Sequence, residues 1–132
     1  MITLATLSGA MFAARARHDN ARGRPASSGL ILAILVQMIA MASIIAAMFW
    51  LGDPTGHARR AIPFVALSYA GLHCGLGAVI SAHALWRLAK GYVSARRRTE
   101  MVLAALWNAY AAGAVILSLG LTGILGLGGA TS

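Results

Sequence analysis

The stretch that decides the fold is Gly29–Leu51, which reads GLILAILVQMIAMASIIAAMFWL. It contains no charged residue, and its only strongly polar side chain is Gln37. A helix needs roughly 20 residues to cross a hydrocarbon core of about 30 Å. We therefore predict that this segment is a helix that spans a membrane.

Two later runs have the same apolar character and are long enough to span. They cover residues 61–85 and 101–127, and Pro63 falls in the first turn of the earlier run, where its missing backbone N–H costs little. A tight turn at Asp53–Gly56 is expected between the first two spans. The sequence thus predicts an all-α integral membrane protein, with residues 1–132 forming one helical domain.

The opening segment, residues 1–14, is apolar but too short to span. Its positive charges, Arg15 and Arg17, follow the apolar run, whereas a secretory signal carries its charges first. We expect a short helix here and leave two placements open. It is either a helix lying at the membrane interface or the end of a membrane-spanning helix.

The composition excludes most soluble classes of protein. Hydrophobic residues make up 59% of the chain and charged residues 11%, against typical values of about 45–50% and about 25%. So few charges cannot cover the surface of a cytosolic globular enzyme. The lone cysteine, Cys74, lies in an apolar run and has no internal partner, so a disulfide-stapled fold is also excluded.

The net charge is +8, and the positions of the basic residues indicate how the chain is oriented in a membrane. Most basic residues lie before the first span or between the second and third, namely Arg15, Arg17, Arg22, Arg24, Arg87, Lys90, Arg96, Arg97 and Arg98. Nucleic-acid binding would need a basic stripe along a polar face, and these residues form no such stripe. Because basic loops stay on the cytoplasmic side, we predict that these residues face the cytoplasm and that the C-terminus lies on the opposite side of the membrane.

Three polar residues fall at membrane depth: Gln37, His73 and Asn108. At a rise of 1.5 Å per residue, all three can share one layer of the bundle. The simpler interpretation is an interhelical hydrogen-bond cluster. The alternative makes His73 a haem ligand or a proton-relay residue. No motif for a metal site, a nucleophile with its base, or a phosphate loop is found, so no catalytic residue and no metal site is predicted.

Small residues indicate where helices pack. Gly71 and Gly75 form a G-x-x-x-G motif that Gly77 and Ser81 extend, and Ala109 and Gly113 repeat the spacing on the third span. Such residues let helix backbones approach closely in membranes. We predict that the second span is the central packing helix and that Gly75 lies at the closest helix contact.

The segment Gly71-Leu72-His73-Cys74-Gly75-Leu76-Gly77 resembles the G-x-H-x-x-x-G stretch of subunit III of the haem–copper cytochrome c oxidases. Further features are similar to the C-terminal region of chains in which subunits I and III are fused. They are Asp53-Pro54, His57-Ala58, the run Ser68–His73, Arg96–Arg98, Trp107 and Tyr110. The resemblance covers about residues 29–127. It departs from the family where Asn108 follows Trp107 in place of a histidine, and where no acidic residue follows on the last helix.

The resemblance implies a non-catalytic accessory subunit of a bacterial-type respiratory terminal oxidase, in the bacterial inner membrane with its C-terminus in the periplasm. Such a subunit would bind no cofactor itself, would pack against a catalytic subunit that holds haem and copper, and would contact lipids. The alternative function is a haem b-binding membrane anchor of a succinate dehydrogenase-type quinone oxidoreductase, with His73 as an axial ligand. A third possibility is a small protein that only scaffolds a larger membrane complex. It shares nearly every expectation with the accessory oxidase subunit.

Overall fold

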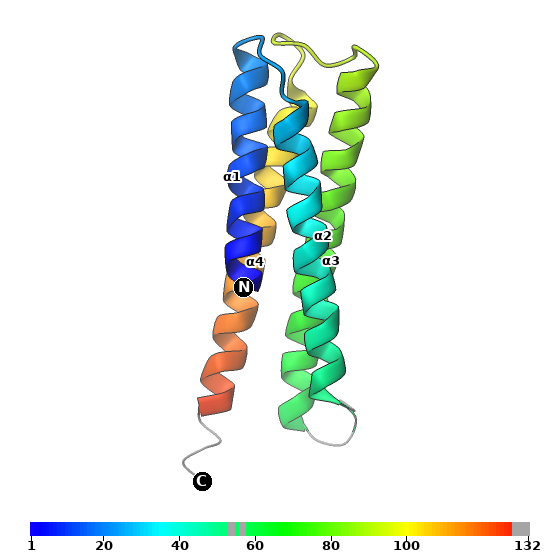
Figure 1. Cartoon of the computed structure of the whole chain (residues 1–132). Helices are drawn as coiled ribbons and strands as arrows, with labels where there is room; N and C mark the ends of the chain where they lie inside the picture. The colour runs from blue at the N-terminus through cyan, green and yellow to red at the C-terminus, as the bar shows by residue number, and fades with distance from the viewer. Residues whose placement is uncertain (53–54, 56–57, 128–132) are drawn as a thin grey trace.

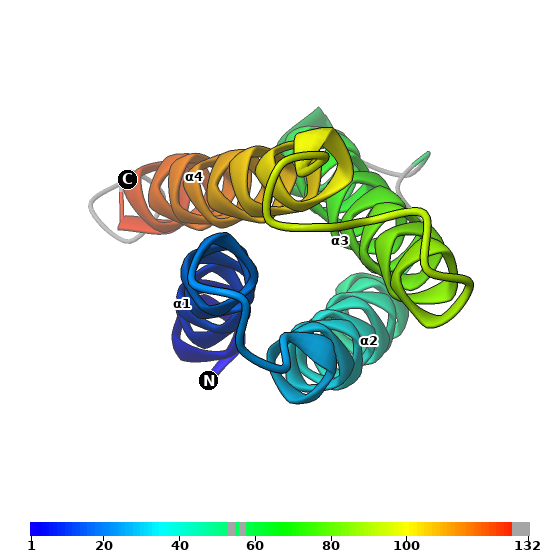
Figure 2. The ribbon, with the colours of Figure 1, turned by 90° about the horizontal axis from the view of Figure 1, so that it is seen from above.

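The chain forms a bundle of four antiparallel helices in a computed structural model that describes residues 1–52, 55 and 58–127 (Figure 1). In order, the helices are α1 (Ile2–Ala21), α2 (Ser27–Leu51), α3 (Ala58–Ala89) and α4 (Thr99–Leu127). Seen along its axis, the bundle is a ring in chain order in which each helix packs against two neighbours (Figure 2). The predicted all-α class is confirmed. Among the three long apolar helices, α3 packs against both α2 and α4, as predicted for a second span that is the central packing helix.

Three of the helices are long and apolar enough to cross a membrane, within the part of the chain that the structure describes. These segments are Ser27–Leu51, Arg60–Ala89 and Thr99–Gly123. Each helix begins or ends a few residues outside the predicted apolar run, because polar residues continue the helix to its caps. The expected turn at Asp53–Gly56 and most of the Asp53 to His57 part of the resemblance lie outside the described residues.

Helix α1 differs from the prediction in length and in placement. It runs to Ala21, well past the apolar run that ends at Ala14, because its stop signal is Gly23 with φ +67°. The Gly23 and Arg24 N–H groups donate to the carbonyls of Asn20 and Asp19, which is a Schellman cap. The same cap closes α3 at Gly91. Local glycine chemistry, rather than hydropathy, therefore sets both ends.

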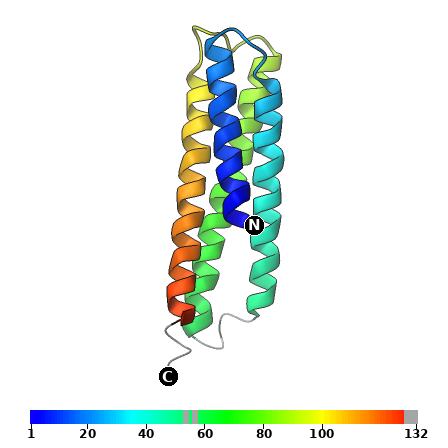
Figure 3. The same cartoon turned by 60° about the vertical axis from the view of Figure 1, so that its left-hand side comes forward.

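Helix α1 stands parallel to the bundle axis between α2 and α4, and does not lie across the bundle's end (Figure 3). One face is buried, with residues spaced by three and four: Thr6, Gly9, Ala13, Ala16 and Asn20. The interfacial placement is thus wrong, and the alternative, the end of a membrane-spanning helix, stays a prediction. α1 begins at mid-height, so α2, α3 and α4 continue beyond it (Figures 1 and 3).

The core is built largely from alanine. In the half that contains both described inter-helix loops, Ala16, Ala26, Ala84 and Ala104 pack with Leu30, Val93 and Met101. In the other half, Ile44, Leu67, Cys74 and Val115 pack with Ala40 and Ala70. Small side chains allow close helix contact, which is typical of packing in membranes. A polar layer separates the two apolar clusters.

Candidate functional site

The polar layer joins α2, α3 and α4 through fully buried side chains. The Gln37 Nε2 group donates to Asn108 Oδ1 at 2.8 Å, and Asn108 Nδ2 donates to Ser81 Oγ at 2.9 Å. Asn108 Nδ2 also donates to the Ala104 carbonyl one turn earlier, at 2.8 Å. Two of the three residues expected in the polar cluster, Gln37 and Asn108, therefore meet. Ser81, expected as a packing residue, is their hydrogen-bond partner.

Glycines make room for the Gln37 amide. A Cβ atom at Gly77 would lie 3.3 Å from Gln37 Nε2, and one at Gly9 would lie 3.6 Å from it. Gln37 lies on the buried face of α2 with Gly29, Ala33, Ala40 and Ile44. The spacing of this face by three and four turns Gln37 toward the bundle axis.

The layer contains one unsatisfied acceptor. Gln37 Oε1 is buried and has no hydrogen-bond partner among the described residues. Polar contacts between membrane helices contribute about 0.6 kcal/mol per pair on average, and a buried unpaired polar group costs about 1–3 kcal/mol. The layer consequently fixes which helix faces meet more than it adds stability.

His73 belongs to a separate cluster of aromatic rings. Its Nδ1 atom lies 2.7 Å from the Tyr69 carbonyl oxygen, and the Trp107 indole N–H donates to the His73 carbonyl at 3.3 Å. The imidazole centroid lies 4.2 Å from the ring of Tyr69, 5.1 Å from Tyr110 and 5.9 Å from Trp107. The prediction of one shared layer is thus wrong for His73, which is buried against rings instead.

Two tyrosines of this aromatic cluster reach the outer surface of α3 and α4. The hydroxyl oxygens of Tyr69 and Tyr110 lie 2.6 Å apart, and either can donate. Both side chains are about half exposed. Only one of the two hydroxyl hydrogens can lie between these oxygens, so the other is left to donate to a neighbouring acceptor.

The glycine motif of α3 contacts α2, as the sequence predicts. A Cβ at Gly71 would lie 3.3 Å from Ile44 Cγ2, and one at Gly75 would lie 3.2 Å from Met41 Sδ. Both nearest atoms are side-chain ends. Gly75 is not at the closest helix contact, because the thioether end of Met41 can move.

Ala109 and Gly113, the packing pair expected on α4, do not lie on the face of α4 that packs against other helices. Ala109 is exposed, and nothing lies within 4 Å of a Cβ built on Gly113. Asn108 points into the core, and the next residue is turned by about 100° around the helix. The observed packing face contains Ala104, Ala105, Asn108, Ala111, Ala112 and Val115.

Among the described glycines, Gly29 makes the tightest contact with another helix, and the sequence analysis did not predict it. A Cβ there would lie 2.9 Å from Ala16 Cβ and 3.0 Å from the Phe12 carbonyl oxygen. A signal for this contact exists in the first 21 residues, where small residues recur every three or four positions from Thr6 to Ala16. Because most residues from Arg15 to Asn20 are polar, a search for apolar spans does not detect this pattern.

Within the described residues, no group of three or more histidine, cysteine, aspartate or glutamate side chains could hold a metal ion. Comparisons with protein-family models, curated proteins and solved structures find no match to this chain.

Proposed function

We propose that the chain is a multi-pass membrane protein that acts as a non-catalytic accessory subunit of a respiratory haem–copper terminal oxidase. Its partner would be the catalytic subunit, which would hold the haem and copper. The observation that carries the accessory role is the tyrosine pair, Tyr69 and Tyr110, on the outer face of two spanning helices.

Membrane placement is supported by the arrangement of charge on the bundle. The α1–α2 and α3–α4 loops lie at the same end of the bundle (Figure 1). Nine of the basic residues lie in or near these two loops, and we call this end the basic end. Positive loops stay in the cytoplasm. The proposal accordingly puts the basic end at the cytoplasmic face of a bacterial inner membrane and the C-terminus in the periplasm.

The depth of the tyrosine pair supports contact with another protein. Tyr69 lies nine residues after Arg60 and Tyr110 ten residues after Glu100, which is about 14–15 Å from each end at 1.5 Å per residue. Both hydroxyls therefore lie near the middle of the proposed bilayer, where acyl chains offer no hydrogen-bond partner. A neighbouring polypeptide can offer one.

An apolar cavity next to the pair adds to this surface. It has a volume of about 510 Å³ and lies between α3 and α4. Its lining residues are Ala61, Ile62, Val65, Ala66, Tyr69, Leu117, Ser118 and Leu121. Aromatic residues next to an apolar pocket are typical anchors of protein interfaces. The identity of the partner as an oxidase rests on the sequence resemblance over about residues 29–127, which includes the Gly71–Gly77 motif.

The alternative, a haem b anchor, is favoured by one contact. His73 Nδ1 bonds a backbone carbonyl, an arrangement that orients many ligating histidines through their other nitrogen. Against it, three aromatic rings pack within 6 Å of the imidazole, and Trp107 is nearly parallel to it. A porphyrin at this position would have to displace them. The residues present therefore do not fit a haem.

The test is copurification of the tagged chain from membranes in mild detergent, followed by identification of the associated proteins. We expect a haem–copper catalytic subunit with the unaltered chain. Replacing Tyr69 and Tyr110 with alanine should remove it, whereas the control pair Leu35→Ala and Ile39→Ala, on the exposed face of α2, should retain it. Retention by the tyrosine variant, or capture of no oxidase subunit by the unaltered chain, would contradict the proposal.

A further inference from the structure

The corner between α1 and α2 at the basic end contains a cavity of about 430 Å³. We call it the α1–α2 pocket, and its lining residues are Phe12, Arg15, Asp19, Arg24, Pro25, Ser28, Gly29 and Leu32. We propose that it binds the phosphate and upper acyl chain of an anionic phospholipid from the cytoplasmic leaflet. This inference rests on the membrane placement proposed above and concerns a site that the oxidase role does not use.

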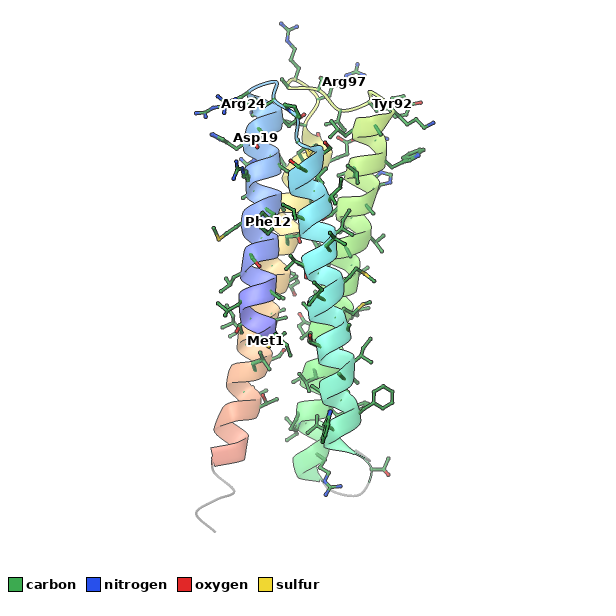
Figure 4. The ribbon with its side chains drawn as sticks, in the orientation of Figure 1. Met1, Phe12, Asp19, Arg24, Tyr92 and Arg97 are labelled. Carbon is green, nitrogen blue, oxygen red and sulfur yellow. The ribbon has the colours of Figure 1, made fainter. Side chains whose placement is uncertain are left out.

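The lining of the pocket changes from charged to apolar residues with depth from the basic end, along the bundle axis. On α1, Phe12 lies three residues deeper than Arg15, and on α2, Leu32 lies four residues deeper than Ser28. These steps are about 4.5 Å and about 6 Å along the helix. Figure 4 shows Arg24 and Asp19 at the basic end and Phe12 below them. A phospholipid is graded in the same direction, from a charged phosphate to an apolar chain.

The charge of the lining matches a phosphodiester. Two arginines and one aspartate leave one positive charge over, and a phosphodiester carries one negative charge. Arg15 Nε lies 3.8 Å from Asp19 Oδ2, at the limit of an ion pair, and the Arg15 side chain is mostly exposed. Its guanidinium can therefore donate to a phosphate while Asp19 holds it in place.

The start of α2 adds to this preference for an anion. Its N-cap residue, Ala26, makes no side-chain cap bond, and its first turn contains no acidic residue. Backbone N–H groups at an uncapped helix start favour negative charge. Basic pockets between membrane helices on the cytoplasmic side are known binding places for anionic headgroups. The geometry and charge together favour an anionic lipid over a zwitterionic one.

The test is native mass spectrometry of the full chain in detergent micelles doped with dioleoyl phosphatidylglycerol or dioleoyl phosphatidylcholine. We expect tighter retention of phosphatidylglycerol. The double variant Arg15→Gln/Arg24→Gln should weaken this binding by about 10- to 30-fold, because each basic group near an anionic lipid contributes a factor of several. The matched control Arg96→Gln/Arg98→Gln removes the same charge from the same end, outside the pocket, and should change it less than threefold.

A second variant guards against a folding defect. Ser28→Asp adds a carboxylate in the first turn of α2, where negative charge stabilises a helix, yet it should repel the phosphate. Equal loss in both arginine pairs, equal retention of the two lipids, or full binding by Ser28→Asp would overturn the inference. Displacement of the lipid by millimolar inorganic phosphate would also overturn it, because the site would then be one for free anions. If lipid binding fails while the oxidase subunit copurifies, only this inference falls.

Discussion

The two halves of the bundle differ in what holds their helices together. In the half toward the basic end, all four helices run side by side. Polar contacts there cross between separate elements: Asn20 Nδ2 donates to the Ser94 carbonyl at 3.2 Å, and Arg87 Nε forms an ion pair with Glu100 at 2.8 Å. In the other half, α2, α3 and α4 continue past the start of α1 and meet mainly through apolar side chains.

The second half is also more open. A cavity of about 480 Å³ lies among the three helices that continue there. Its lining residues are Ala47, Trp50, Leu51, Pro63, Leu67, Leu119 and Thr122. We infer that the tight contact of small residues at Gly29 in the basic half, together with the buried amides of the polar layer, determines which helix faces meet. Substitutions in the two halves should consequently differ in effect.

The largest effect is expected at Gly29. In Gly29→Ala, the new Cβ meets Ala16 Cβ and the Phe12 carbonyl oxygen, which is backbone and cannot move alone. Overpacking of this kind costs about 1–3 kcal/mol. The matched variant Gly75→Ala meets only the Met41 thioether end and should change stability by less than about 1 kcal/mol. Unfolding by sodium dodecyl sulfate titration in mixed micelles measures both, and equal losses would contradict the close contact at Gly29.

The next effect concerns the buried amides. Asn108→Leu leaves Gln37 Nε2 without its partner, and Gln37→Leu leaves Asn108 Oδ1 without its partner. Each should cost about 1–2 kcal/mol, whereas the double variant should recover part of the loss because no amide is then left unpaired. A double-mutant cycle measured by the same titration gives the coupling. Strict additivity would show that the two amides do not interact.

A smaller effect is expected for the ion pair between α3 and α4. Glu100→Gln removes the carboxylate from Arg87, which also lies 5.4 Å from the ring centroid of Tyr92. Partly exposed pairs contribute about 0.2–1 kcal/mol, and salt screens them. The loss should therefore shrink as sodium chloride is raised in thermal unfolding experiments. A loss that does not depend on salt would point to packing instead.

The smallest effect is expected at Trp50, in the open half. Its side chain is 91% exposed, so Trp50→Ala should change the stability of the isolated chain by no more than about 0.5 kcal/mol. Thermal unfolding in detergent provides the measurement. A loss above 1 kcal/mol would mean that Trp50 packs on the bundle.

Hydropathy and charge predicted the long helices well, because span length and loop charge are properties of single segments. The all-helical class, the three apolar runs and the clustering of basic residues at one end all follow from them. The same signals failed for α1, where Gly23, rather than the end of the apolar run at Ala14, stops the helix. A short apolar run therefore marks only part of this helix, whose polar end buries one face, at Ala16 and Asn20, against its neighbours.

The candidate site was predictable in its residues more than in its pairings. Gln37 and Asn108 stand out as polar residues in apolar runs, but their partner Ser81 does not. The separation of His73 from this layer depends on helix rotation, which the sequence pattern leaves open. Rotation also explains Ala109 and Gly113, since small residues occur on every face of α4 and only the buried Asn108 fixes which face turns inward.

The measurement that tests the central claim most directly is a reduced-minus-oxidised absorption spectrum. It should be recorded on the tagged chain purified with its associated proteins, and again after the chain is isolated from them. An accessory oxidase subunit predicts haem bands of a, b or o type in the complex and none in the isolated chain. A b-type band that stays with the isolated chain and is lost in His73→Ala would contradict the account and make the chain a haem-binding anchor.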